Sequence, residues 1–119
     1  MIRVKRAYDP PAPDDGSRFL VDRLWPRGMK RERLALDGWL KDVSPSDELR
    51  HWFGHAPAKW EEFCHRYYAE LESNGEAWLP LLNLTHKQDI TLLYSAHDND
   101  HNNAKALKMF LEEKLNEAH

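Results

Sequence analysis

The sequence predicts a small single-domain α/β fold, in which helices flank a mainly parallel central sheet of three to four strands. Two short apolar runs, residues 19–21 and 90–94, have the composition of strands buried on both faces, which is usual in parallel sheets. A long segment with helical apolar spacing separates the two runs, and parallel strands need such a crossover. At 119 residues, we expect one domain over 1–119.

The N-terminal segment predicts an edge strand. Apolar and basic residues alternate over residues 2–5 until Arg6 interrupts the pattern, which is typical of a strand with one charged face. Prolines, aspartates and a glycine over residues 9–16 then end this strand. We expect it to flank the central pair.

The first buried run leads into a loop and two short elements. A proline and a glycine force a loop over residues 22–28. Apolar positions over 30–43 fit neither the helix nor the strand period cleanly. We predict a short helical turn near 30–34 and a short strand near 36–42.

The middle of the chain predicts helices. Ser46, or Ser44 ahead of a proline, starts the first helix, and Gly54 ends it. Pro57 opens the second, which has the clearest amphipathic pattern in the chain. Its apolar face holds Trp60, Phe63, Cys64, Tyr67 and Leu71.

This second helix is expected to bury Trp60, Phe63, Tyr67 and Leu71. The charged residues between them are expected to stay in solvent: Glu61, Glu62, Arg66 and Glu70. Tyr68 lies off the apolar face, so we expect it to meet solvent or a partner.

Two further helices are predicted. One follows an Asn-Gly pair and extends to about His86, provided that Pro80 lies in its first turn. After the second buried run, a polar loop over 97–103 leads into the last helix, whose apolar residues 104–115 have helical spacing.

Charge and cysteine content exclude several classes. The net charge of −3 gives no overall basic excess, although residues 1–33 carry nine Lys and Arg against five acids. A single cysteine, Cys64, cannot form an internal disulfide, and the N-terminus lacks the apolar region of a signal peptide. No stretch approaches the roughly 18 apolar residues that span a bilayer. We therefore expect a cytoplasmic protein without membrane contact.

Familiar catalytic and binding motifs are missing. The chain contains no Gly-rich phosphate loop, serine nucleophile elbow, zinc-finger pairing or EF-hand loop. The absence of these motifs disfavours most nucleotide-binding and hydrolase classes. Nothing in the sequence assigns a cofactor or an oligomeric state.

A longer set of motifs carries a family resemblance. The segment Asp22-Arg23-Leu24-Trp25-Pro26-Arg27-Gly28 occurs together with Trp52-Phe53-Gly54-His55, Tyr94-Ser95-Ala96 and His101-Asn102-Asn103-Ala104. With these motifs the whole chain resembles the YeaO-like proteins, within the domain of unknown function 488. The resemblance implies a compact prokaryotic α/β domain and no established activity. More distant members carry Cys-His-Arg where this chain has residues 101–103, so cysteine chemistry is not carried over to that position.

The loop after the first buried run is the first candidate binding segment. Ligands bind beyond the carboxyl ends of strands in open α/β sheets. Arg23 and Arg27 are donors that suit phosphate or carboxylate, and Trp25 offers a planar stacking surface. Asp22, at the start of the same loop, is also a candidate ligand-binding residue. The structural alternative is that Asp22 pairs with an arginine to hold the loop while Trp25 belongs to the core.

The loop over residues 97–103 is the second candidate. It precedes a helix N-terminus, whose free amide groups favour an anion. Capping by Asp98 or Asp100 explains the same residues. Together with His97 and His101 these acids are chemically able to hold a divalent metal, but their spacing matches no metal motif, so no metal site is assigned.

The leading hypothesis is a polar crevice between the two loops that binds a small anionic molecule, a nucleotide or phosphorylated metabolite. Tyr94 and Asn102 would orient this ligand, and His97 or His101 would transfer a proton if a reaction occurs. His55 reaches the crevice as an acid or base, or else it complements a helix C-terminus.

The alternative hypothesis is a non-catalytic module that binds nucleic acid or protein through the basic N-terminal third. This hypothesis requires one exposed face that holds Arg3, Lys5, Lys30, Arg31 and Arg33.

Overall fold

A four-stranded parallel sheet forms the centre of the molecule. The computed structural model describes residues 1–117. The strands are β1 (Ile2–Arg6), β2 (Ser17–Leu20), β3 (Gly38–Trp39) and β4 (Ile90–Tyr94). They lie in the order β1-β4-β2-β3, and every adjacent pair is parallel. The predicted α/β class with a mainly parallel sheet is confirmed.

The two apolar runs are adjacent strands, as predicted. Leu20 of β2 lies opposite Leu93 of β4, and the N–H of Val21 donates to the carbonyl of Leu93 at 3.1 Å. The N-terminal strand β1 pairs with the other edge of β4, with Ile2 opposite Ile90. Because β4 is central, all five of its residues are buried.

Short elements connect β2 to the helices. The helical turn α1 (Arg31–Leu34) forms where expected, but the predicted strand over 36–42 is reduced to β3. The chain leaves the sheet after Trp39 because residues Lys41–Val43 turn into a 3₁₀ helix, η2.

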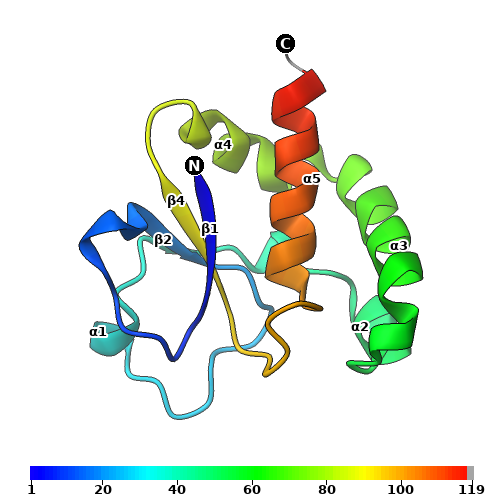
Figure 1. Ribbon diagram of the computed structural model, residues 1–119, viewed down its shortest axis with the longest axis horizontal. Helices are drawn as coiled ribbons and strands as arrows, with labels where there is room; N and C mark the ends of the chain where they lie inside the picture. The colour runs from blue at the N-terminus through cyan, green and yellow to red at the C-terminus, as the bar shows by residue number, and fades with distance from the viewer. Residues whose placement is uncertain (118–119) are drawn as a thin grey trace.

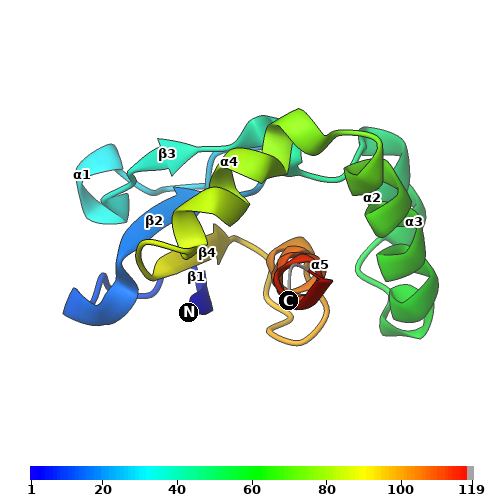
Figure 2. The ribbon, with the colours of Figure 1, turned by 90° about the horizontal axis from the view of Figure 1, so that it is seen from above.

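Four longer helices follow. They are α2 (Asp47–Phe53), α3 (Trp60–Glu72), α4 (Gly75–Thr85) and α5 (Asn103–Glu117), with 3₁₀ turns η1 (Pro13–Asp15) and η3 (Pro57–Lys59). Helix α5 packs against β1 and β4, and in both views it lies between the sheet and α3 (Figures 1 and 2). On the other face, α1 and the segment before it cover Leu20 and Leu93. Both faces of β2 and β4 are therefore covered, which explains the apolar runs at residues 19–21 and 90–94. Within residues 1–117, no helix is long and apolar enough to cross a membrane.

The caps of α2 are those that the sequence predicts. The Oγ of Ser46 accepts a hydrogen bond from the N–H of Leu49 at 3.1 Å. Gly54 ends the helix in the left-handed region with φ +53°. These caps place the C-terminal end of α2 beside the loop that follows β2.

The burial pattern of α3 differs in part from the prediction. Phe63, Tyr67 and Leu71 are buried, whereas Trp60 is only half-buried because it lies at the first turn, against Phe53 and the ring of His101. The predicted solvation of Glu70 is also wrong, since its carboxylate accepts hydrogen bonds from the N–H and hydroxyl of Ser46.

The remaining differences on the helices concern Tyr68 and Pro80. Tyr68 is half-buried, because its ring packs edge-on against Phe110 of α5. Pro80 is the sixth residue of α4 rather than part of its first turn. The helix continues through the proline because Trp78 and Leu81 are buried on either side of it, and this burial outweighs the local cost.

A buried ion pair connects the start of β2 to three other elements. The Oδ2 of Asp15 lies 2.5 Å from Nη1 of Arg18, and both residues are at most 4% exposed. Asp15 also accepts from Lys5 of β1 and from the N–H of Ala12, while Arg18 donates to the carbonyl of Leu34. Burial opposes ionisation of Asp15, but these hydrogen bonds outweigh it and hold its pKa below the ordinary value.

Candidate functional site

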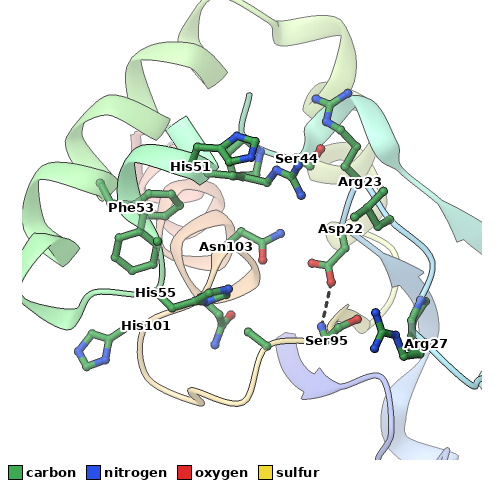
Figure 3. Close-up of a pocket in the computed structure, with 18 of the residues that line it drawn as sticks. Asp22, Arg23, Arg27, Ser44, His51, Phe53, His55, Ser95, His101 and Asn103 are labelled. Carbon is green, nitrogen blue, oxygen red and sulfur yellow. Dashed lines mark hydrogen bonds between the residues drawn. The ribbon is translucent and has the colours of Figure 1, made fainter. Parts of the chain in front are cut away.

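A cavity of about 600 Å³ lies at the carboxyl ends of β2 and β4. The loop after β2, the α2 segment and the turn before α5 enclose it, and Figure 3 shows its lining side chains. Its polar and charged lining consists of Tyr8, Asp22, Arg23, Trp25, Arg27, Ser44, Arg50, His51, His55, Ser95, His101, Asn102 and Asn103. The two loops that the sequence singled out thus share one cavity, at the sheet edge where ligands bind in α/β folds.

Asp22, Ser95 and Asn103 form the floor. The backbone N–H of Ser95 donates to Oδ2 of Asp22 at 2.9 Å, and the Asn103 amide faces the carboxylate (Figure 3). Nδ2 of Asn103 also donates to the carbonyl of Val21 at 3.0 Å. Burial raises the pKa of Asp22, although the hydrogen bond from Ser95 opposes the shift. In residues 1–117 no arginine forms an ion pair with Asp22, so the alternative that such a pair holds the loop is wrong.

Three arginines surround the floor. Asp47, at the start of α2, accepts a hydrogen bond from Nη2 of Arg50 at 2.8 Å and lies 3.6 Å from Nε of Arg23. Arg27 is exposed and, among the described residues, makes no ion pair. The rim therefore carries more positive charge than its single nearby carboxylate neutralises.

Three buried polar atoms of residues that line this cavity make no hydrogen bond within the described chain. Nε of Arg23, Nε of Arg50 and Oγ of Ser95 are buried atoms without a hydrogen bond. In the described part of the chain these are the only such side-chain atoms, and all three residues line this cavity. Buried polar groups are normally paired, so the clustering of exceptions marks this cavity as a candidate site.

Three histidines contribute to the walls. Nδ1 of His101 lies 2.9 Å from Oδ2 of Asp98, and this hydrogen bond lowers the pKa of Asp98. His55 follows Gly54 and also has a positive φ, +56°. Nδ1 of His51 lies 2.7 Å from the carbonyl of Asp47. In Figure 3, His101 and Arg27 lie at opposite ends of the view.

Most of the predicted ligand residues line the cavity. They are Asp22, Arg23, Trp25, Arg27, His55, His101 and Asn102. Trp25 has a structural role as well, because its ring packs edge-on against Trp39 and its Nε1 donates to the carbonyl of Met29.

Two predicted residues lie outside the cavity lining. The ring of Tyr94 is buried, and its hydroxyl donates to Oδ1 of Asn99 at 2.8 Å, away from the cavity lining. His97 is exposed and does not line the cavity. The hypothesis that His97 transfers a proton in this crevice is therefore not supported.

Asn102, and neither Asp98 nor Asp100, caps α5. Its Oδ1 accepts from the N–H of Lys105 at 2.9 Å and its carbonyl accepts from Ala106. Asp98 instead holds the preceding turn, since it accepts from the N–H groups of Asp100 and His101. The capping prediction chose the wrong residue because several good caps lie within five positions.

Sequence reasoning missed six polar lining residues: Tyr8, Ser44, Arg50, His51, Ser95 and Asn103. Ser95 follows β4 directly and Asn103 begins α5, so their positions at the two ends of this connection were a usable signal. Arg50 and Ser44 come from the α2 segment. The motif at residues 52–55 was recognisable in the sequence, but the sequence did not show that this segment packs beside the cavity. No group of three or more potential metal ligands occurs within residues 1–117.

The basic residues of the alternative hypothesis lie near opposite edges of the sheet. Arg3 and Lys5 lie on the edge strand β1, half-buried, where they pair with Asp89 and Asp15. The others, Lys30, Arg31 and Arg33, lie at or beside α1, which leads into β3 at the opposite edge of the sheet.

Comparisons with known proteins identify the family. A family model described as the "Inactive DUF488-N3 subclade" matches residues 1–119. The "Uncharacterized protein YeaO" of Escherichia coli (strain K12) is 44% identical over 110 residues, which cover 92% of this chain and 96% of that protein. The "Uncharacterized protein Rv3073c" of Mycobacterium tuberculosis is 43% identical over 90 residues, or 76% of this chain and 75% of that protein. No solved structure matches. The predicted resemblance is confirmed, and the chain belongs to the YeaO-like DUF488 family.

Proposed function

We propose that the cavity binds a small anionic ligand, a nucleotide or another phosphorylated metabolite, and that binding rather than catalysis is its role. The observation that carries this proposal is the clustering of unpartnered polar atoms. Two of the three belong to arginines, whose guanidinium groups recognise phosphate and carboxylate.

The charge of the cavity supports the same ligand class. Arg23, Arg27 and Arg50 line it, while Asp22 is the only carboxylate in its lining. Asp47 neutralises part of the rim, but Arg27 has no acidic partner among residues 1–117. An anionic ligand would complete this charge balance.

The arrangement of the histidines favours binding over proton transfer. Nδ1 of His101 is engaged by Asp98, and its ring lies edge-on against Trp60 at 5.3 Å. These contacts give His101 a structural role. The description of the matching family model as inactive is consistent with a binding role.

A cytoplasmic, bacterial setting fits this role. The relatives named above are bacterial proteins, and Cys64 is a free thiol in α3. Burial raises the pKa of Cys64 to about 11, so it stays protonated and unreactive at neutral pH.

A thermal-shift panel tests the proposal. The full chain is melted with nucleotides, sugar phosphates, dicarboxylates and neutral sugars. A ligand at about 100 times its dissociation constant adds about 2.7 kcal/mol of stability, which moves Tm by roughly 8 to 15 °C in a domain of this size. At least one phosphorylated compound is expected to do so, and neutral sugars are not.

Arg27→Ala is the matching variant. Because Arg27 is exposed and unpaired among the described residues, its loss should change stability by less than about 0.5 kcal/mol. It should weaken the ligand about 10- to 100-fold, the range for a charge-assisted hydrogen bond. Arg33→Ala, exposed near α1, is the control and should leave binding unchanged. If no anion shifts the melting temperature, or if both variants behave alike, the proposal is wrong.

A further inference from the structure

A carboxylate at the floor of a cationic cavity requires its own explanation. Asp22 lies at the carboxyl end of β2, faces the Asn103 amide and lines the same cavity as three arginines (Figure 3). A second carboxylate or a phosphate placed directly against it would be repelled. The anionic group of a ligand therefore belongs at the rim and a different group belongs at the floor.

Asp22 also lies at the N-terminus of α5, where the positive end of the helix would otherwise attract an anion. Asn103, the first residue of α5, lies beside its carboxylate, so the positive end of the helix already has a negative partner. This arrangement moves the anion site away from the α5 terminus. Arg27, on the loop after β2, remains the available positive group, since it makes no ion pair among the described residues while Arg23 lies beside Asp47.

The floor is equipped to accept hydrogen bonds. A carboxylate offers about four lone-pair positions, and the backbone N–H of Ser95 uses one of them. The Oγ of Ser95, beside it, is a buried atom without a hydrogen bond among the described residues. A ligand hydroxyl suits both groups, because it donates to the carboxylate and accepts from or donates to the serine.

We propose that the cavity selects phosphate esters that carry hydroxyl groups, with the phosphate at Arg27 and the hydroxyls at Asp22 and Ser95. This inference rests on the proposed function. The cavity volume of about 600 Å³ lies within the range of small-molecule sites and accommodates a sugar phosphate.

Isothermal titration calorimetry on the full chain tests the selection. The hydroxylated probes are ribose 5-phosphate, glucose 6-phosphate and glycerol 3-phosphate, and n-butyl phosphate is the ester without hydroxyls. At least one hydroxylated ester should bind about 10- to 100-fold more tightly than butyl phosphate, the range for a hydrogen bond to a charged group.

Asp22→Asn should reduce this preference to less than about threefold. Asparagine keeps an oxygen that can accept from the N–H of Ser95, so the loop retains its internal contact. Because the variant removes a negative charge, butyl phosphate should bind as well as before or better. Ser95→Ala, which removes a hydroxyl without a partner, should reduce the preference in part and leave folding unchanged.

Asp47→Asn is the matched control for loss of a carboxylate. Asp47 lies at the rim beside Arg23 and Arg50, so neutralising it should change the affinity for all phosphate esters by a similar factor. The preference for hydroxylated esters should stay as in the unmodified chain.

The outcomes separate the two proposals. If butyl phosphate and the hydroxylated esters bind equally, or if Asp22→Asn retains the preference, Asp22 and Ser95 do not recognise hydroxyl groups of the ligand. This inference is then wrong, while the proposal of anion binding stands. If no phosphate ester binds and no other anion shifts the melting temperature, the anion site itself is wrong and this inference fails with it.

Discussion

Replacing Asp15 with alanine should lower the free energy of unfolding by about 3–5 kcal/mol, the range for breaking a buried ion pair. The cost follows from the position of Arg18, whose guanidinium is only 4% exposed and would lose its carboxylate partner. The carbonyl of Leu34 would remain as an acceptor but carries no full charge. Lys5 is half-buried on the edge strand and can turn toward solvent, so it adds little.

Urea denaturation followed by tryptophan fluorescence measures this cost. With a slope of about 1–3 kcal/mol per molar urea, a loss of about 4 kcal/mol moves the midpoint by roughly 2 M. Asp14→Ala is the control, because Asp14 is exposed and lies 3.8 Å from Arg3, a contact worth about 0.5 kcal/mol or less. The double variant Asp15→Ala, Arg18→Met should recover at least about 1 kcal/mol, because it removes the unpaired buried charge.

The effect should also depend on pH. The pKa of Asp15 is lowered in the folded chain, so its ionised form contributes stability above the ordinary value of 3.8. This contribution is lost as the pH falls below that value toward the folded-state pKa. Asp89 and Asp98 have lowered pKa values too, but they are present in both proteins and cancel in the difference. A cost below about 1 kcal/mol at pH 7, or one that does not shrink below pH 3.8, would refute the reasoning.

Two further predictions concern the helices beside the cavity. Trp60→Ala should cost about 2 kcal/mol in urea melts, roughly half of the 3–5 kcal/mol for a fully buried ring, because Trp60 is half-buried; a loss above about 4 kcal/mol would contradict this. Asn102→Ala should cost about 1 kcal/mol because it removes the N-cap of α5, whereas Asp100→Ala should cost less than about 0.5 kcal/mol; equal losses in thermal melts would show that the cap is shared.

Local sequence predicted the centre of the fold well. The runs at 19–21 and 90–94 are apolar at every position except Thr91, and this pattern distinguishes them from amphipathic elements. The caps Ser46 and Gly54 were also readable, because each is a residue type specialised for its backbone position. The short strand β3 could not be predicted in the same way, because two paired residues are too few to show a hydrophobic period.

The candidate site divides in the same way. Asp22, Arg23 and Arg27 follow β2, and the loops after parallel strands lie at the carboxyl edge of the sheet. The proximity of these residues to the turn before α5 was therefore predictable. Arg50 was not predictable, because it reaches the cavity only through the way α2 packs. That packing depends on the ring of Phe53 stacking on Phe63 at 4.4 Å, a contact between helices that periodicity does not specify.

The central position of β4 has a consequence for how the chain folds. In the described sheet β1 pairs with β4 alone, as in the pairing of Ile2 with Ile90, whereas β2 pairs with both β3 and β4. During synthesis, β1 therefore leaves the ribosome long before its partner exists. Sheets that depend on such distant pairings fold slowly and expose unpaired edges meanwhile. β1 carries three basic residues, Arg3, Lys5 and Arg6. Charged side chains on an unpaired strand oppose its pairing with other chains, so they reduce aggregation of the nascent chain before β4 is synthesised.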